Sequence, residues 1–137
     1  MKKIDIALIQ LRTSIQLYNK DNFIAALTLA GAAEEILGKI SKKNSKTNAA
    51  IEEKIFIDQI ADIYKKDRPS YNKVLNLRHK LKNEIKHNDR GDNDDIIHDF
   101  KCEAETFILG AIRNYELIFR EIPNDRIIKS FWDRSSL

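Results

Sequence analysis

Residues 23–33 read FIAALTLAGAA, and this is the stretch that decides the fold. Drawn as a helix, it is apolar nearly all the way round, and such a helix is stable only when neighbouring elements cover it on several sides. Its small alanine and glycine side chains allow those neighbours to approach closely. The stretch therefore predicts a central, buried helix, which the surrounding sequence extends over residues 22–40.

On both sides of this central helix, apolar residues recur at every third or fourth position, which is typical of amphipathic helices. The expected helices cover residues 3–19, 51–64, 70–87 and 94–121, and a polar, positively charged loop is expected at 41–49. The helix at 51–64 is expected to anchor itself through apolar residues, namely Ile51, Ile55, Ile60 and Ile63. The sequence contains no strand alternation, internal repeat or glycine-rich phosphate loop.

These patterns predict an all-α, up-and-down bundle of four to five helices at residues 1–122. An amphipathic C-terminal tail is expected at 123–137, beyond Pro123, which ends the preceding helix. Four apolar tail residues are expected to dock on the bundle or on a second subunit, because apolar tails rarely stay in water. These residues are Ile127, Ile128, Phe131 and Trp132.

The composition places limits on the class of protein. The chain has 137 residues, of which 42% are hydrophobic and 33% charged, a balance typical of a soluble globular domain. With Cys102 as the single cysteine, an intrachain disulfide or a cysteine-rich zinc site is excluded, and the thiol is expected to be buried. No apolar run approaches the roughly 20 residues that span a bilayer, and no signal peptide is recognised. A cytoplasmic protein is therefore expected.

The charge is unevenly distributed, although the net charge is only +3. Residues 65–90 carry nine lysines and arginines against three acids, whereas residues 92–105 carry six acids against one lysine. The basic block favours a polyanionic partner such as RNA, with Lys80, Lys86 and Arg90 in contact with it. Alternatively, the two blocks face each other as neighbouring helices.

The end of the basic helix carries the strongest chemical signal, at residues 81–89, LKNEIKHND. Asn83 and His87 are four residues apart and share one helical face, and histidine is the natural acid or base near neutral pH. Three interpretations remain open: a metal-independent ribonuclease site, a nucleic-acid contact, or a polar cap at a helix end. No metal is expected, because His79 would have to pair with Asn83, which is a poor zinc ligand.

Glu34 is the second candidate, because its carboxylate projects from an otherwise apolar stripe of the central helix. A buried carboxylate needs a partner, and the basic helix offers four cations. These cations are Arg78, Lys82, Lys86 and His87. A structural ion pair and a catalytic role both remain open, and a pair with His87 would raise the pKa of the histidine.

Residues 29–38 (LAGAAEEILG), residues 82–87 (KNEIKH) and the helical pattern together resemble the HEPN superfamily. These are all-helical domains of prokaryotic toxins, defence systems and nucleotidyltransferase partners. The motif of active members is an arginine, a polar residue, a short spacer and a histidine. Asn83 and His87 match the last two of these residues, and Lys82 stands in place of the arginine. Lysine keeps the charge but lacks the bidentate fork that holds a phosphate.

The resemblance implies a homodimeric, RNA-directed protein of a bacterial or mobile-element defence or toxin–antitoxin type. It implies a weak or degenerate metal-independent endoribonuclease that needs no cofactor. His87 would be the acid or base, Lys82 would stabilise the phosphorane and Asn83 would orient it, with Glu34 and Arg78 in support. The alternative is a non-enzymatic helical interaction module, antitoxin-like or a regulatory subunit, with a protein partner.

Overall fold

The computed structural model describes residues 1–74, 76 and 99–135, and every regular element in these ranges is an α-helix. The prediction of an all-α protein is therefore confirmed. The helices are α1 (Lys3–Asn19), α2 (Phe23–Ser45), α3 (Ala49–Ile63), α5 (Phe100–Phe119) and α6 (Arg126–Ser135). The side chain of Asn22 caps α2, accepting a hydrogen bond from the Ala25 N–H at 3.4 Å.

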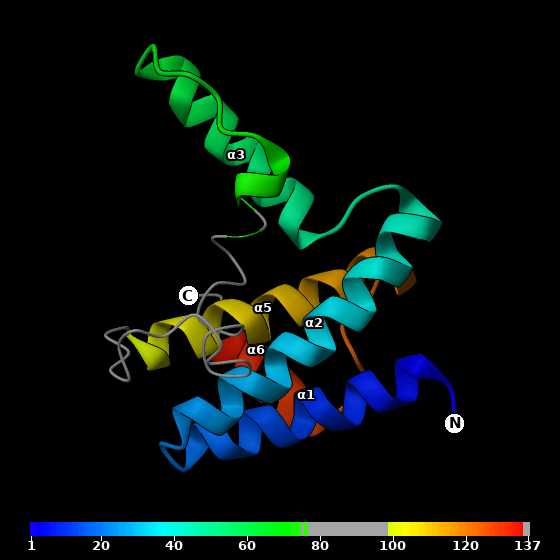
Figure 1. Cartoon of the computed structure of the whole chain (residues 1–137). Coiled ribbons are helices and arrows are strands. Elements are labelled where there is room, and N and C mark those ends of the chain that lie inside the picture. Colours follow the sequence, from blue (N-terminus) through cyan, green and yellow to red (C-terminus); the bar gives the residue numbers. More distant parts are fainter. Residues whose placement is uncertain (75, 77–98, 136–137) are drawn as a thin grey trace, which may run out of the picture.

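The central helix is α2, as the sequence predicts. It lies against α1 on one side and α5 on the other, and Figure 1 shows these three helices side by side. Ala26, Ala30 and Ala33 are fully buried, so the neighbouring backbones can approach closely. Leu27 and Leu37 are also fully buried, and each contributes about 1.5–3 kcal/mol through the burial of its side chain.

The C-terminal tail packs on the chain's own core. It forms α6, whose Ile128 and Phe131 are buried in the same cluster as the apolar residues of α1, α2 and α5. Phe131 also makes an edge-to-face contact with Tyr18, with ring centroids 5.4 Å apart. The Tyr18 hydroxyl donates to Glu105 of α5, and burial together with this bond raises the pKa of Tyr18 above its usual range.

The predicted end of the central helix at residue 40 is wrong, because α2 continues to Ser45. The loop predicted at 41–49 is confirmed only for residues 46–48, between α2 and α3. The buried Ser41 hydroxyl donates to the Thr47 carbonyl at 2.7 Å, and Ser45 donates back to the Ser41 carbonyl at 2.8 Å. These local bonds satisfy the two serine hydroxyls at the C-terminal end of α2 and tie that end to the residues that follow. The chain then turns at Lys46, whose φ of 61° lies in the left-handed region.

The predicted apolar anchors of the next helix are also wrong. Ile55, Ile60 and Ile63 are exposed, and Ala61 is the buried residue in that half of α3. The reason is visible in Figure 1, where α3 leaves the layer formed by α1, α2 and α5. Its periodicity therefore produces an apolar face without placing that face in the core.

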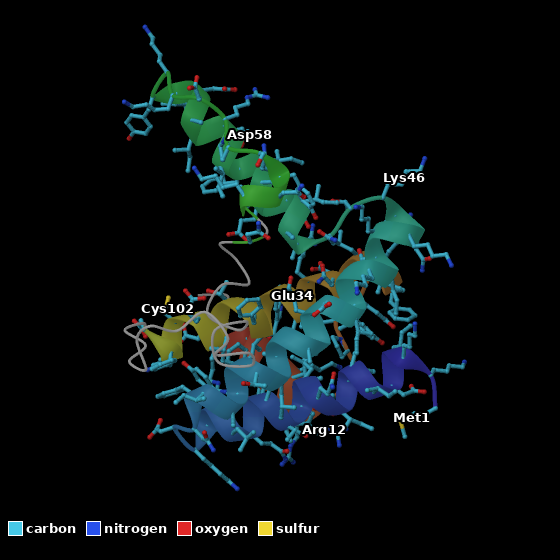
Figure 2. The ribbon with its side chains drawn as sticks, viewed as in Figure 1. Met1, Arg12, Glu34, Lys46, Asp58 and Cys102 are labelled. Carbon is cyan, nitrogen blue, oxygen red and sulfur yellow. The ribbon has the colours of Figure 1, made fainter. Side chains whose placement is uncertain are left out.

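The expected burial of Cys102 is wrong as well, because the thiol is exposed. Helix α5 begins at Phe100, and the Asp99 side chain caps it by accepting from the Cys102 N–H at 3.0 Å. Cys102, which is labelled in Figure 2, lies in the first turn of α5. The fully buried residues Ala104, Phe107 and Ile108 follow it along the helix.

Candidate functional site

Most of the predicted site lies outside the described residues. This applies to the predicted catalytic residues Lys82, Asn83 and His87, to Arg78, and to the predicted RNA contacts Lys80, Lys86 and Arg90. Their roles and their mutual geometry stay predictions. Glu34 is the predicted site residue whose position the structure describes.

Glu34 lies in the middle of α2 and is 3% exposed, so its carboxylate belongs to the interior. Its backbone carbonyl accepts a hydrogen bond from Asn114 Nδ2 of α5 at 3.1 Å. Glu34 is therefore placed at the contact of α2 with α5, in surroundings where a charge requires compensation.

A buried amide, Asn114, is the connecting residue of this region. It is fully buried in α5, and while its Nδ2 binds α2, its Oδ1 accepts from the Ala49 N–H at 2.7 Å. Ala49 is the first residue of α3, so one side chain joins three helices. Sequence reasoning missed Asn114, although its position three residues after Ala111 places an amide in the apolar stripe of α5.

A second amide, Asn48, completes the joint between α2 and α3. Its Nδ2 donates to the Gly38 carbonyl at 3.2 Å, and its Oδ1 caps α3 by accepting from the Ile51 N–H at 2.9 Å. Gly38 suits the close approach, because a Cβ there would lie 3.1 Å from Asn114 Nδ2, a tight contact that the amide would have to relieve by a small shift. The two amides fix the N-terminal end of α3 to the core.

An ion-pair network supports the same joint at the surface. Arg113 of α5 donates from Nε and Nη2 to the two carboxylate oxygens of Glu52, at 3.0 and 3.1 Å, and from Nη1 to Glu116 at 2.9 Å. These bonds, the one to Glu52 first, raise the pKa of Arg113. Because Arg113 is 40% exposed, the network positions α3 and contributes only a small part of the stability.

The start of the basic helix is described, and it lies near the C-terminal half of α2. As predicted, Ser70 begins the first turn of this helix, at residues 71–74. Its hydroxyl accepts a hydrogen bond from the Lys73 N–H and its carbonyl accepts one from the Val74 N–H, both at 3.1 Å. The Lys42 ammonium of α2 lies 5.7 Å from the centroid of the Tyr71 ring, a cation–π contact. The basic helix therefore begins beside the helix that carries Glu34.

The segments that meet at this contact, and the turn after α3, carry exposed cations. They are Lys42, Lys43, Lys46, Lys65, Lys66, Arg68 and Lys73. A separate, open groove of 480 Å³ runs along α6, and it is lined by Asn124, Arg126, Lys129, Ser130, Asp133 and Arg134. Glu34 does not line that groove, so the two features are distinct.

Within residues 1–74, 76 and 99–135, no group of three or more histidine, cysteine or acidic side chains is arranged to hold a metal ion. In the same ranges, none of the helices has the length and apolar character needed to cross a membrane. Comparisons with protein-family models, with curated proteins and with solved structures gave no match.

Proposed function

We propose that the chain is an HEPN-like, RNA-directed protein of a bacterial or mobile-element defence or toxin–antitoxin type, and a weak, metal-independent endoribonuclease. The observation that carries the proposal is the segment KNEIKH at residues 82–87, which follows a strongly basic stretch in an all-helical protein. Two described features support it. The first turn of the basic helix lies beside α2, and α2 holds the buried carboxylate of Glu34.

In the proposed reaction, His87 takes the proton from a ribose 2′-hydroxyl, and the freed oxygen attacks the adjacent phosphorus. The bond from phosphorus to the 5′-oxygen breaks, and that oxygen gains a proton. The products are a 2′,3′-cyclic phosphate and a 5′-hydroxyl. Lys82 offsets the charge on the phosphoryl oxygens and Asn83 orients them. Lysine in place of arginine makes the activity weak, because the lysine ammonium cannot bind two phosphoryl oxygens at once in the way that the planar guanidinium of arginine does.

The cations of the basic region should bind RNA through its phosphates. Replacing Lys42 and Lys43 with glutamine should weaken binding and flatten its dependence on salt concentration, because two fewer counterions are released from single-stranded RNA. Fluorescence anisotropy of a labelled RNA, titrated at several salt concentrations, measures both effects.

The matched control removes the same charge from the two ends of α1, where Lys3 and Lys20 are exposed. The Lys3→Gln/Lys20→Gln protein should keep the salt dependence of the wild type. Wild-type binding that does not weaken as salt rises would contradict an electrostatic origin of the interaction.

The proposed site allows two arrangements, one in which Glu34 is the counter-charge of His87 and one in which His87 works in a cleft between two subunits. The first arrangement predicts an effect of Glu34 on the histidine. Glu34→Gln should then lower the pKa of His87 and destabilise the fold, because a histidine cation would lose its carboxylate partner. Titration of the histidine ring by NMR, together with a thermal melt, measures both effects. The control is Glu35→Gln, the exposed neighbour that pairs with Lys39. An unchanged His87 pKa in Glu34→Gln would remove Glu34 from the site.

A second candidate function has a specific observation in its favour. The apolar residues that α3 leaves exposed are typical of a protein-binding surface, which fits a non-enzymatic interaction module, antitoxin-like or a regulatory subunit. The two functions differ in one measurable respect. The interaction module binds its partner without cleaving RNA, whereas the ribonuclease loses its activity when His87 is replaced.

A further inference from the structure

The open groove along α6, here called the α6 groove, has a volume of 480 Å³. This volume lies within the range of sites that bind small molecules, about 300–1,000 Å³. All of the residues that line the α6 groove are polar or charged: Asn124, Arg126, Lys129, Ser130, Asp133 and Arg134. Each of them is exposed, so a ligand can reach their side chains from solvent.

The buried side of α6 fixes the groove to the core of the protein. Ile128 and Phe131 are buried, and they lie on the side of α6 that packs against the other helices. Asp125 holds the start of α6, because its Oδ1 accepts from the Ile127 and Ile128 N–H groups at 2.9 and 3.1 Å. Arg12 of α1 donates from Nε to Asp125 Oδ2 at 2.6 Å. The groove is therefore built on a docked helix and not on a loop.

Two of the cations that line the groove are held in position and still have hydrogen-bond donors left. Arg134 donates from Nε to the Ser130 carbonyl at 3.2 Å and from Nη2 to Asn19 Oδ1 of α1 at 3.3 Å. The Lys129 ammonium donates to Asn124 Oδ1 at 3.0 Å. An arginine side chain has five N–H donors and a lysine side chain has three, so both residues keep donors for a ligand.

The cations of the groove are not neutralised by the part of the chain that the structure describes. Arg68 and Arg113, elsewhere on the surface, are paired with carboxylates. No carboxylate in residues 1–74, 76 and 99–135 forms an ion pair with Arg126, Lys129 or Arg134. Their charges are therefore available to an anionic ligand, and hydrogen bonds between such cations and phosphate are among the strong ones.

We propose that the α6 groove binds a sugar phosphate, that is, a small molecule with one phosphate monoester and several hydroxyl groups. Three lining cations against one lining carboxylate give the groove a net charge of +2. A phosphate monoester carries a charge of about −1.5 to −2 at pH 7, so the two charges match. This inference uses described residues alone and does not rest on the proposed ribonuclease activity.

Asp133 determines which phosphate compound the groove prefers. Its carboxylate repels a plain phosphate ion, but it accepts hydrogen bonds from the hydroxyl groups of a sugar. RNA carries a long row of phosphodiesters, whereas α6 covers only 10 residues, a length of about 15 Å. A single phosphate monoester beside several hydroxyl groups therefore suits the groove better than RNA does.

An NMR titration of the ¹⁵N-labelled protein with glucose 6-phosphate tests the proposal. The amide signals of residues 124–134 should move, with a dissociation constant between about 0.1 and 1 mM, as expected for a small ligand in an open groove. Arg126→Gln and Arg134→Gln should each weaken binding about tenfold, because each removes a charge-assisted hydrogen bond. The control is Lys3→Gln, which removes one charge from the exposed start of α1 and should bind like the wild type.

Asp133→Ala separates recognition of the sugar from simple attraction of charge. The wild type should bind glucose 6-phosphate at least about tenfold more tightly than inorganic phosphate. In Asp133→Ala this preference should fall at least about threefold, because the sugar loses its acceptor while inorganic phosphate loses a repulsive charge. A carboxylate that acts through its charge alone would leave the preference unchanged, and that result would contradict the role of Asp133.

Three further results would overturn the proposal. Signals of residues 124–134 that stay in place in the wild type at about 10 mM glucose 6-phosphate would remove the site, and this result depends on no variant. Inorganic phosphate that binds as tightly as glucose 6-phosphate would leave a plain anion site. A single-stranded RNA that moves the same signals at lower concentrations than glucose 6-phosphate would assign the groove to RNA.

Discussion

The Asn114→Ala protein should unfold roughly 10 °C below the wild type, equivalent to about 3 kcal/mol. The substitution removes both of the buried hydrogen bonds of Asn114, leaving the Glu34 carbonyl and the Ala49 N–H without their partner. It also leaves a cavity where α2, α3 and α5 meet, and a cavity adds to the loss because the surroundings relax only partly.

Circular dichroism during a thermal melt measures this effect. Asn124→Ala is the matched control, because Asn124 is exposed and its side chain accepts one bond from Lys129. It should melt close to the wild type, as surface substitutions usually do. If Asn114→Ala melted with the control, the joint of α3 would not be held by this amide.

The second large effect is on activity. His87→Ala should lower the rate of RNA cleavage about 10²- to 10⁴-fold, the usual contribution of a positioned acid or base. If His87 works in a cleft between two subunits and is not the partner of Glu34, the melting temperature of this variant should change little. The control is His98→Ala, which removes the same type of side chain from the acidic block.

A different result for His87→Ala would give His87 a structural role. If His87→Ala melted many degrees lower, and the wild type had no cleavage to lose, the histidine would be structural. The chain would then be an interaction module, and the exposed apolar residues of α3 would be its best described surface.

The fold was readable from the sequence wherever local signals agree. The apolar period predicts the first helix at 3–19, and α1 covers Lys3–Asn19. FIAALTLAGAA was recognisable as a central helix, because only a covered helix tolerates apolar residues on every side. The same helical projection placed Glu34 on an apolar stripe, and the structure shows that this residue is buried.

Other features depended on tertiary contacts that periodicity does not contain. An apolar face indicates that something covers it but not which element does, so the isoleucines of α3 were wrongly assigned to the core. The extension of α2 to Ser45 runs through a polar stretch without an apolar period, in which serine side chains bind the backbone, a pattern that favours loops. Asn114 acts through Glu34 and Ala49, far away in the sequence.

The candidate site was read from a motif and not from geometry. Residues 82–87 supplied a charge, an amide and an imidazole at helical spacing, which defines a type of chemistry. Whether these groups converge with Glu34 depends on the packing of residues outside the described ranges. The roles of Lys82, Asn83 and His87 therefore remain a proposal.

The chemical ends of the cleaved RNA provide the most direct test of the proposed function. Wild-type protein is incubated with RNA in the presence of EDTA, and the product ends are identified by mass spectrometry. The account predicts slow cleavage that EDTA does not affect, leaving a 2′,3′-cyclic phosphate and a 5′-hydroxyl. No cleavage, or cleavage that EDTA abolishes and that leaves a 3′-hydroxyl, would contradict it.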